Sequence, residues 1–297
     1  MTDRLLLDVS SLMYRAHFAL GDSVRQPDGA LVGAVHGYLD MVVRLLNNRR
    51  PDEAVHVYDH DWRPTARTAI YPAYKANRPP EPEGLPGQFV LLRQVLDLSG
   101  MPQAETPDWE AEDAIGGIIL SAPPEDRFEM VSGDRDLLQL VRDPQVTLLF
   151  TLRGVSELAT FDEDAVLAKY GVPASRYSEF AILRGDPSDG LPGVQGVGEK
   201  TAMALVQTYP DLDAMLADAA IDDPQPGPLK GKPALRAKLA ASAEYLDQMR
   251  RIVPVNDTAP MATWAGPRDD AAILDLADAT GLRGPVRRLL AALDRTG

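Results

Sequence analysis

The sequence predicts an α/β fold in which a mainly parallel sheet carries helices on both faces. Short apolar runs alternate with segments whose apolar residues repeat at helical spacing through the first half of the chain. Because helices separate successive strands, we expect parallel strands whose carboxyl ends meet at one edge. The strand patterns occupy residues 4–9, 53–58, 127–131 and 146–150, and the helical patterns occupy 12–20, 33–46, 89–98, 109–120 and 137–141.

The first two strands each deliver an acid to that edge. The run RLLLDV at 4–9 is apolar apart from its ends, and Asp8 stands near its carboxyl end. The run EAVHVY at 53–58 is followed directly by Asp59. Two carboxylates are therefore expected side by side at the active edge of the sheet.

Residues 61–88 interrupt the alternation with a stretch rich in proline, arginine, tyrosine and lysine. A connection of this length inside a compact domain is usually functional or disordered. Its basic and aromatic side chains suit a mobile element that grips an unpaired nucleic-acid strand by charge and stacking, and a plain surface loop is the alternative. The side chains concerned are Arg67, Tyr71, Tyr74, Lys75 and Arg78.

Beyond residue 160 the pattern is mostly helical, so we expect an α/β domain at 1–160 and a helical region at 161–297. The latter contains RGDPSDGLPGVQGVGEKTAM, in which Gly193, Gly196 and Gly198 allow tight turns and present bare amides to an anion. The spacing predicts a helix-hairpin-helix at 177–208, an element that holds a nucleic-acid backbone without reading bases. Its parts are a helix at 177–183, a hairpin at 191–198 and a helix at 200–207.

Two other interpretations of this glycine stretch exist. Gly193 and Gly198 have the gap of a nucleotide-binding Walker A loop, but Glu199 intrudes before Lys200 and places a carboxylate where phosphates would lie. We therefore reject the nucleotide site. An ordinary helix end followed by a turn is the second alternative. Further helices are expected at 211–219, 233–251, 270–280 and 286–293, with a proline-rich break at 222–228.

Composition and charge limit the class of protein. The 297 residues are 45% hydrophobic and 25% charged, which is ordinary for a globular protein. The chain shows no transmembrane run and no signal-peptide layout, and the absence of cysteine excludes disulfides and thiolate metal sites, so we expect a cytoplasmic protein without a membrane partner. The net charge of −14 argues against a nucleic-acid partner unless the acids gather locally around cations.

Nine acids fall at strand ends, helix starts or the glycine-rich loop. Each one alone has an ordinary explanation as a cap or dipole partner, but together they would repel strongly unless cations neutralised them. Oxygen-only ligands select hard ions, so we expect two or more Mg²⁺ or Mn²⁺ ions, and a pair about 4 Å apart suits phosphoryl displacement. The four histidines show no ligand spacing and are interpreted as structural or surface residues. The nine acids are Asp8, Asp59, Glu110, Glu112, Asp113, Asp134, Asp136, Asp186 and Asp189.

The whole chain resembles the 5′ nucleases, meaning flap endonucleases and the 5′ nuclease domain of bacterial DNA polymerase I. The motifs are LLLDVSSLMYRAHFAL, YPAYKANRPPEPEGLP, WEAEDAIG, SGDRDLLQL and GDPSDGLPGVQGVGEKTA. The resemblance implies a PIN-like domain with a helical arch at about 61–88, a helix-hairpin-helix of the H3TH type, and metal binding by the nine acids. Glu112 departs from the aspartate that bacterial relatives commonly have there, which implies altered metal geometry.

The resemblance also implies roles for the basic residues. Lys75 and Arg78 would belong to the arch and steer the scissile phosphate, and Tyr74 would stack near the cleavage site. Arg15 and Arg67 match phosphate-contacting arginines, although DHDWRP after Asp59 is one residue longer than usual and leaves Arg67 in doubt. The hairpin, through Gly193, Gly196, Gly198 and Lys200, would hold the duplex behind the cut with a K⁺ ion on its carbonyls.

Two hypotheses follow from these observations. The first is a free-standing, monomeric, metal-dependent 5′ nuclease that removes flaps and degrades 5′ ends of DNA, with RNA–DNA hybrids as further substrates. It would act in Okazaki fragment processing and repair at the bacterial nucleoid, in functional connection with DNA polymerase I. The second is a branched-DNA-binding module of the same fold that has lost hydrolysis. All nine ligand positions remain acidic, which favours the first hypothesis.

Overall fold

The central strands carry unbroken apolar runs because helices cover both faces of their sheet. The computed structural model describes residues 1–296. In β1 (Asp3–Asp8), Leu5 and Leu7 belong to the core under one face, whereas Leu6 belongs to the core under the other. Successive strand side chains point to opposite faces, so a strand buried on both sides needs apolar residues at every position. Burying each leucine contributes about 1.5–3 kcal/mol.

The strands form one seven-stranded sheet. They are β1, β2 (Glu53–Tyr58), β3 (Gln103–Glu105), β4 (Arg127–Ser132), β5 (Val146–Arg153), β6 (Glu157–Phe161) and β7 (Ala262–Trp264). Their order is β6-β5-β4-β1-β2-β3-β7, in which the five inner strands pair in parallel and the two edge strands pair antiparallel. The predicted mainly parallel α/β fold is confirmed.

Three strands were missed by the sequence patterns. β3 and β7 have only three residues each, which is too short for a periodic signal. β6 follows β5 through a tight turn in which Gly154 has a φ of +52°, and most of its side chains are partly exposed. These edge elements depend on neighbours that are distant in sequence or on turn geometry rather than on a local apolar run.

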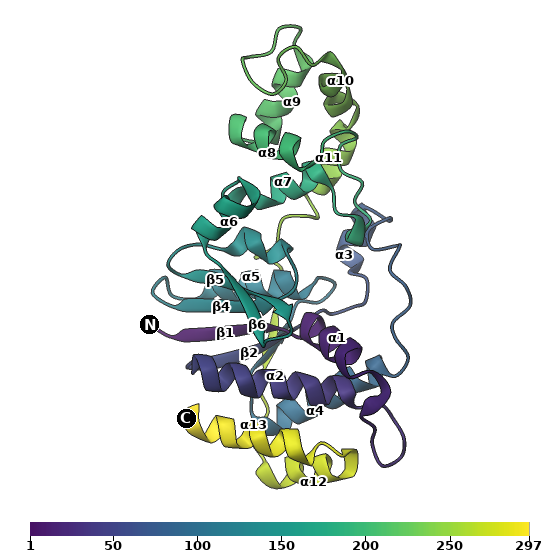
Figure 1. The fold of residues 1–297 in the computed structure, drawn as a ribbon, viewed down its shortest axis with the longest axis vertical. Helices are drawn as coiled ribbons and strands as arrows, with labels where there is room; N and C mark the ends of the chain where they lie inside the picture. Colours follow the sequence, from purple (N-terminus) through teal and green to yellow (C-terminus); the bar gives the residue numbers. More distant parts are fainter. Residues whose placement is uncertain (297) are drawn as a thin grey trace.

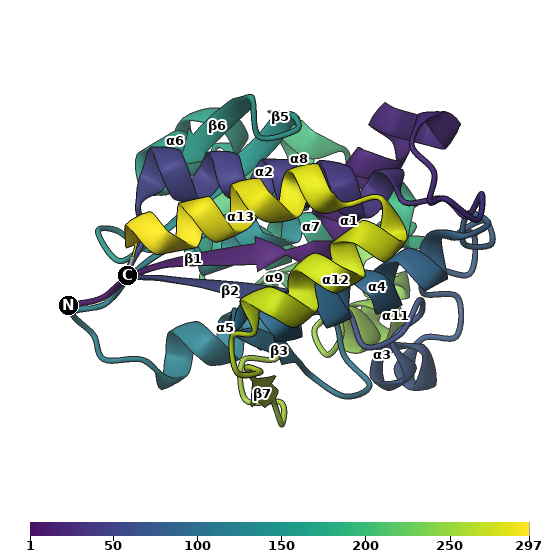
Figure 2. The same ribbon diagram turned by 90° about the horizontal axis from the view of Figure 1, so that it is seen from below.

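Two sets of helices sandwich the sheet (Figures 1 and 2). One face is covered by five helices that share a core: α1 (Val9–Leu20), α2 (Gly33–Arg49), α4 (Leu85–Ser99), α12 (Asp270–Thr280) and α13 (Arg283–Thr296). The other face packs on α5 (Ala111–Ser121) and α6 (Glu163–Tyr170), whose core continues into the helical region.

The helical region extends away from the sheet at the top of Figure 1. The predicted helix at 233–251 is interrupted at Ser242, whose hydroxyl donates to the Lys238 carbonyl at 2.9 Å. A serine hydroxyl that bonds to the carbonyl four residues earlier bends a helix. At Ser242 the predicted helix divides into α10 and α11. The region comprises α7 (Tyr177–Arg184), α8 (Glu199–Thr208), α9 (Leu212–Ala220), α10 (Pro233–Ala241) and α11 (Ala243–Met249).

The last part of the chain returns to the α/β core. β7 pairs with β3 at the sheet edge, and α13 packs along α2 while α12 packs on α4 (Figure 2). Arg288 of α13 bonds to Asp40 of α2 at 2.6 Å. Residues 262–296 therefore share a core with the N-terminal part, and the proposed domain boundary at residue 160 stays a prediction.

The expected arch at 61–88 is helical over α3 (Thr65–Ile70) and again at residues 85–88, where α4 begins, and residues 71–84 form turns and extended loops. Prolines at 72, 79, 80 and 82 supply no amide hydrogen, so a second helix cannot form there. Across residues 1–296, no helix is long and apolar enough to cross a membrane.

Candidate metal centre and nucleic-acid interface

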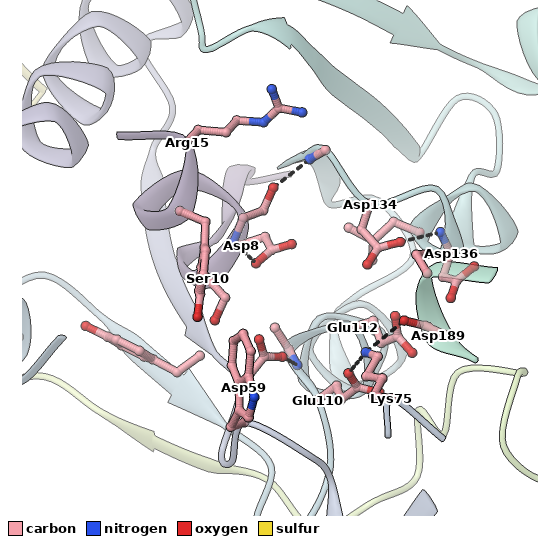
Figure 3. Close-up of a pocket in the computed structure, with 18 of the residues that line it drawn as sticks. Asp8, Ser10, Arg15, Asp59, Lys75, Glu110, Glu112, Asp134, Asp136 and Asp189 are labelled. Atoms are coloured by element: carbon pink, nitrogen blue, oxygen red, sulfur yellow. Dashed lines mark hydrogen bonds and ion pairs between the residues drawn. The ribbon is translucent and has the colours of Figure 1, made fainter. Parts of the chain in front are cut away.

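Acidic side chains gather around one cavity at the carboxyl ends of the inner strands (Figure 3). The cavity has a volume of about 1150 Å³. β1 ends at Asp8, Asp59 directly follows β2, and Asp134 lies two residues after the end of β4. The structure brings eight of the nine predicted ligands to its walls: Asp8, Asp59, Glu110, Glu112, Asp134, Asp136, Asp186 and Asp189.

Asp8 connects β1 to α1 and to the loop after β4. Its carboxylate caps α1 through the Ser11 amide at 3.0 Å and accepts a hydrogen bond from the Ser132 hydroxyl at 2.5 Å. Burial, together with the neighbouring Asp59, raises the pKa of Asp8 to about 7. The Ser132 hydroxyl in turn accepts from the Asp134 amide at 2.9 Å. These serines were not predicted as site residues, although Ser11 lies three residues after Asp8 and Ser132 two residues before Asp134.

Glu112, Asp134 and Asp136 form the tightest group, because one carboxylate oxygen from each lies within 4.8 Å of the others. Burial, followed by repulsion from other acids, raises the pKa of Asp136 well above its usual value. Burial also raises the pKa values of Glu112 and Asp134. Carboxylates packed this closely need cations to ionise, and an oxygen-only donor set fits Mg²⁺ or Mn²⁺.

Lys75 lies among these acids rather than on the surface. Its ammonium group pairs with Glu110 and lies 3.7 Å from an Asp189 oxygen, and its amide donates to the Asp189 carbonyl at 2.9 Å. Burial lowers the pKa of Lys75, but Glu110 and Asp189 more than offset this and the net shift is upward. Conversely, burial would raise the pKa of Glu110, but Lys75 and Arg67 lower it to about 2.

The other predicted DNA-contacting side chains differ in their access to the cavity. Arg15 and Arg78 line it, and Arg78 lies 3.5 Å from Asp189 with its guanidinium over the Trp62 ring. Tyr74 is buried, and its hydroxyl donates to Glu110 at 2.8 Å and lies 3.1 Å from an Asp189 oxygen, which is an alternative acceptor for the same hydrogen. Its ring therefore does not present a free face for a nucleobase in this structure.

Arg67 and Asp113 lie beneath the cavity instead of on its walls. Arg67 is 0% exposed, and its guanidinium contacts both oxygens of Asp113 at 2.7 and 3.0 Å. Asp113 also accepts hydrogen bonds from the Asn256 and Glu110 amides. The structure thus places the predicted phosphate-contacting arginine inside the protein, paired with one of the nine predicted metal ligands.

The predicted helix-hairpin-helix forms between α7 and α8. Gly193 and Gly196 have φ values of +67° and +80°, which only glycine adopts without strain. The Gly193 amide donates to the Tyr245 hydroxyl at 3.0 Å, so it is occupied within the protein. Gly196, Gly198 and Lys200 are exposed at the start of α8 and remain accessible to a ligand.

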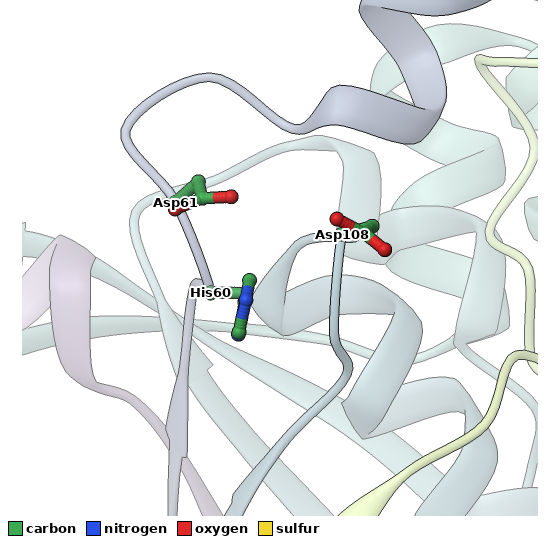
Figure 4. Close-up of side chains that lie close together, drawn as sticks. All are labelled: His60, Asp61 and Asp108. Carbon is green, nitrogen blue, oxygen red and sulfur yellow. The ribbon is translucent and has the colours of Figure 1, made fainter.

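A second group of side chains converges at the rim, although the histidines showed no ligand spacing in the sequence. His60, Asp61 and Asp108 have ligand atoms within 4.8 Å of one another (Figure 4). All three are exposed, and Asp108 accepts a hydrogen bond from the Thr65 hydroxyl at 2.6 Å. We interpret the group as a polar contact between the base of the 61–88 segment and the loop before α5.

Two family models cover most of the chain. The model described as the 5′-3′ exonuclease N-terminal resolvase-like domain matches residues 3–171, and that of the 5′-3′ exonuclease C-terminal SAM fold matches residues 172–266. The resemblance inferred from the sequence motifs is thereby confirmed.

Among known proteins, a Streptomyces coelicolor protein named 5′-3′ exonuclease is 40% identical, with 97% of this chain and 99% of that protein covered. A Mycobacterium tuberculosis protein of the same name is 38% identical, and the match covers 98% of this chain and 97% of that protein. The DNA polymerase I of Mycobacterium bovis is also 38% identical, but this match covers 88% of the chain and only 29% of the polymerase.

Solved structures share the fold at lower identity. The T5 D15 protein co-crystallised with metal ions has a TM-score of 0.68 at 16% identity, with 99% of this chain and 100% of that one covered. Flap endonuclease-1 from Methanococcus jannaschii has a TM-score of 0.65 at 18% identity, and the match covers 99% of this chain and 93% of that one. With family models over residues 3–266 and two relatives matched along nearly their full length, the chain belongs to the 5′-3′ exonuclease family.

Proposed function

We propose that the protein is a structure-specific, divalent-metal-dependent 5′ nuclease that hydrolyses phosphodiesters in DNA bearing 5′ flaps, nicks or free 5′ ends. The observation that carries this proposal is the cavity in which eight of the nine predicted metal ligands meet the cationic side chains of Arg15, Lys75 and Arg78. Acids alone would repel a nucleic acid, whereas acids that hold metal cations beside basic side chains attract the phosphate to be cut.

The metal ligands follow from the donor set. Glu112, Asp134 and Asp136 would hold one ion, because their oxygens already lie within 4.8 Å of one another. The remaining acids on the walls supply ligands for at least one more ion. When bound, Mg²⁺ or Mn²⁺ supplies Lewis acidity and a nucleophilic water at neutral pH.

The chain's own residues bind and orient the DNA. Lys75 and Arg78 offer positive charge to the scissile phosphate, and Arg15 offers a further contact on the opposite wall (Figure 3). Fixed charges that are already aimed at the reacting phosphate stabilise the charge that develops in the transition state. The burial of Lys75 among acids means that its position depends on the charge state of Glu110 and Asp189.

The hairpin would hold the duplex behind the cut. Gly196, Gly198 and Lys200 are exposed at the N-terminus of α8, where amides and the helix dipole favour a phosphate. The proposal includes a K⁺ ion bound by the hairpin carbonyls.

The proposal also covers substrates and cellular role. The protein would act as a monomer and would cut RNA–DNA hybrids as well as DNA. It would work at the bacterial nucleoid during Okazaki fragment processing and repair, in functional connection with DNA polymerase I.

An end-labelled duplex with a 5′ flap tests the proposal. The protein and its Asp134→Ala variant are each incubated with this DNA in EDTA, Mg²⁺ and Mn²⁺, and an Asp61→Ala variant controls for the loss of an acid at the rim. We expect metal-dependent cutting near the flap base that disappears with Asp134→Ala and persists with Asp61→Ala. Tight binding without cleavage in every condition would favour a DNA-tethering module instead.

A further inference from the structure

Arg67 occupies an unusual position for an arginine of a DNA-processing protein. It extends from α3 beneath the N-terminus of α5, is 0% exposed, and is among the largest fully buried side chains within residues 1–296. It does not line the cavity, whereas Arg15 and Arg78 do. A buried charge is costly unless it is fully paired, so its partners should explain why it is there.

All five donors of the guanidinium group have acceptors. Nε donates to the Ile252 carbonyl at 2.7 Å. Nη1 donates to Glu110 and Asp113, each at 2.7 Å. Nη2 donates to Glu112 at 2.6 Å and to Asp113 at 3.0 Å. No donor is left for a phosphate, so the group acts on the protein itself.

The shape of the guanidinium explains why these three acids can lie side by side. Its planar fork contacts Asp113 through two parallel bonds and reaches Glu110 and Glu112 from the same plane. A lysine has three donors on a tetrahedral nitrogen and cannot reproduce this arrangement. The rings of Trp109 and Tyr74, at 5.4 and 6.0 Å from the guanidinium carbon, flank the group and restrict its movement.

Glu112 connects Arg67 to the metal centre. One of its oxygens accepts from Arg67, and its carboxylate also belongs to the tight group with Asp134 and Asp136. The bond to Arg67 therefore sets the direction in which the carboxylate faces the cavity. We infer that Arg67 is a positioning residue that orients Glu112 and Glu110 for metal binding and does not contact the DNA.

The inference rests on the proposed function but is tested separately from it. Mn²⁺ binding without DNA is measured by isothermal titration calorimetry for the unaltered protein and for Arg67→Lys, which keeps the charge and loses the fork. We expect the Mn²⁺ affinity to fall about 10- to 100-fold, the usual effect of removing a group that orients a metal ligand. Affinity for flap DNA in EDTA should change less than about twofold, and raising the Mn²⁺ concentration should restore cleavage.

Two control variants show whether a loss of Mn²⁺ affinity is specific to Arg67→Lys. Arg176→Lys alters an arginine that also bonds to several acceptors, the Glu179 carboxylate and the Val206 and Tyr209 carbonyls, but in the helical region. It should leave Mn²⁺ affinity unchanged. Arg15→Lys alters a cavity-lining arginine and should weaken DNA binding without weakening Mn²⁺ binding. If Arg67→Lys behaves like Arg15→Lys instead, Arg67 contacts the DNA and the inference is wrong.

A measurement on the unaltered protein covers the case in which Arg67→Lys does not fold. The Nε–H group of Arg67 is buried against the Ile252 carbonyl, so its NMR signal should exchange slowly with solvent. We expect this signal to shift on addition of Mg²⁺ and to stay in place on addition of flap DNA in EDTA. A shift caused by DNA alone, or no shift with Mg²⁺, would overturn the inference. A chain that binds Mg²⁺ in this way but cuts no DNA would contradict only the proposed function.

Discussion

The acidic cavity and the glycine hairpin are proposed to hold the same DNA, yet they are built in opposite ways. In and beneath the cavity the buried groups are charged, with Lys75 and, below it, Arg67 enclosed among carboxylates. In the hairpin the buried groups are apolar, since Val194 and Val197 point inward while Lys200 is exposed. We conclude that the cavity is sensitive to changes of charge and the hairpin to changes of backbone shape.

The largest expected effect tests the charge of the cavity. Lys75→Ala removes the buried ammonium group that pairs with Glu110 and Asp189. Loss of one charge directed at a transition state costs about 100- to 1,000-fold in rate, or roughly 3–4 kcal/mol. Single-turnover cleavage should fall by this amount while duplex affinity changes by less than about threefold. Lys169→Ala, an exposed lysine on α6, is the matched control, and equal losses of rate and affinity in Lys75→Ala would contradict the assigned role.

The next effect tests the shape of the hairpin. Gly193 has a positive φ, and a Cβ atom there would lie 2.5 Å from the Arg184 backbone. Gly193→Ala should therefore destabilise the protein by about 2 kcal/mol or more and weaken duplex binding, without changing Mn²⁺ affinity. Gly198→Ala is the matched control, because no atom lies within 4 Å of its Cβ position and its φ is −92°. Equal melting temperatures for the two variants would show that the hairpin tolerates a change of shape.

A third prediction concerns the pH dependence of Mg²⁺ binding in the cavity, which the hairpin should not affect. The pKa of Asp8 is raised to about 7, so in the absence of metal the carboxyl group holds a proton that Mg²⁺ must displace. Below pH 7 the proton on Asp8 alone should lower the Mg²⁺ affinity about tenfold per pH unit, or about 1.4 kcal/mol, and the raised pKa values of Glu112, Asp134 and Asp136 make the fall steeper. Calorimetry between pH 5.5 and 8 measures this, and a constant affinity would contradict it.

The same pKa predicts the stability of the metal-free protein. Between about pH 4 and pH 7, the folded chain retains a proton on Asp8 that the unfolded chain has released. The folded state therefore binds more protons in this range, so Asp8 makes the free energy of unfolding decrease as pH rises through it. Asp8→Asn should weaken this dependence, and denaturant titrations in EDTA at three pH values provide the measurement.

The smallest expected effect concerns one surface charge on the hairpin. Lys200→Ala should weaken duplex binding about fivefold, roughly 1 kcal/mol, and lower the slope of log affinity against log salt by about 0.9. Glu199→Gln, at the preceding position, removes a charge of the opposite sign and should strengthen binding slightly. An unchanged salt slope in Lys200→Ala would exclude a phosphate contact at this residue.

The sequence predicted four of the five inner strands, the hairpin and the gathering of eight acids because these depend on local patterns. The fifth inner strand, β3, is too short to give such a pattern. An acid at the end of a parallel strand, such as Asp8, or directly after one, such as Asp59, lies at the carboxyl edge of the sheet. The glycines of the hairpin are similarly local, since each φ value is required by the turn itself.

The interior partners of the charged groups could not be predicted in this way. Arg67 meets the acids of α5 only after residues 43 to 46 positions away have folded against it, and its contact with Ile252 spans 185 positions. No periodicity in the sequence separates an arginine that is exposed from one that is buried among carboxylates. For the same reason the division of roles between Arg67 and Arg15 required the three-dimensional structure.

The return of residues 262–296 to the core has a consequence for biosynthesis. A nascent chain leaves the ribosome from its N-terminus, so β3 and α2 emerge long before β7 and α13 can cover them. Until then the apolar surface of α2 and the edge of β3 stay exposed, and such surfaces promote aggregation with other chains. Translation that stops before residue 262 would leave this surface uncovered, although every predicted metal ligand and the hairpin would already have been made.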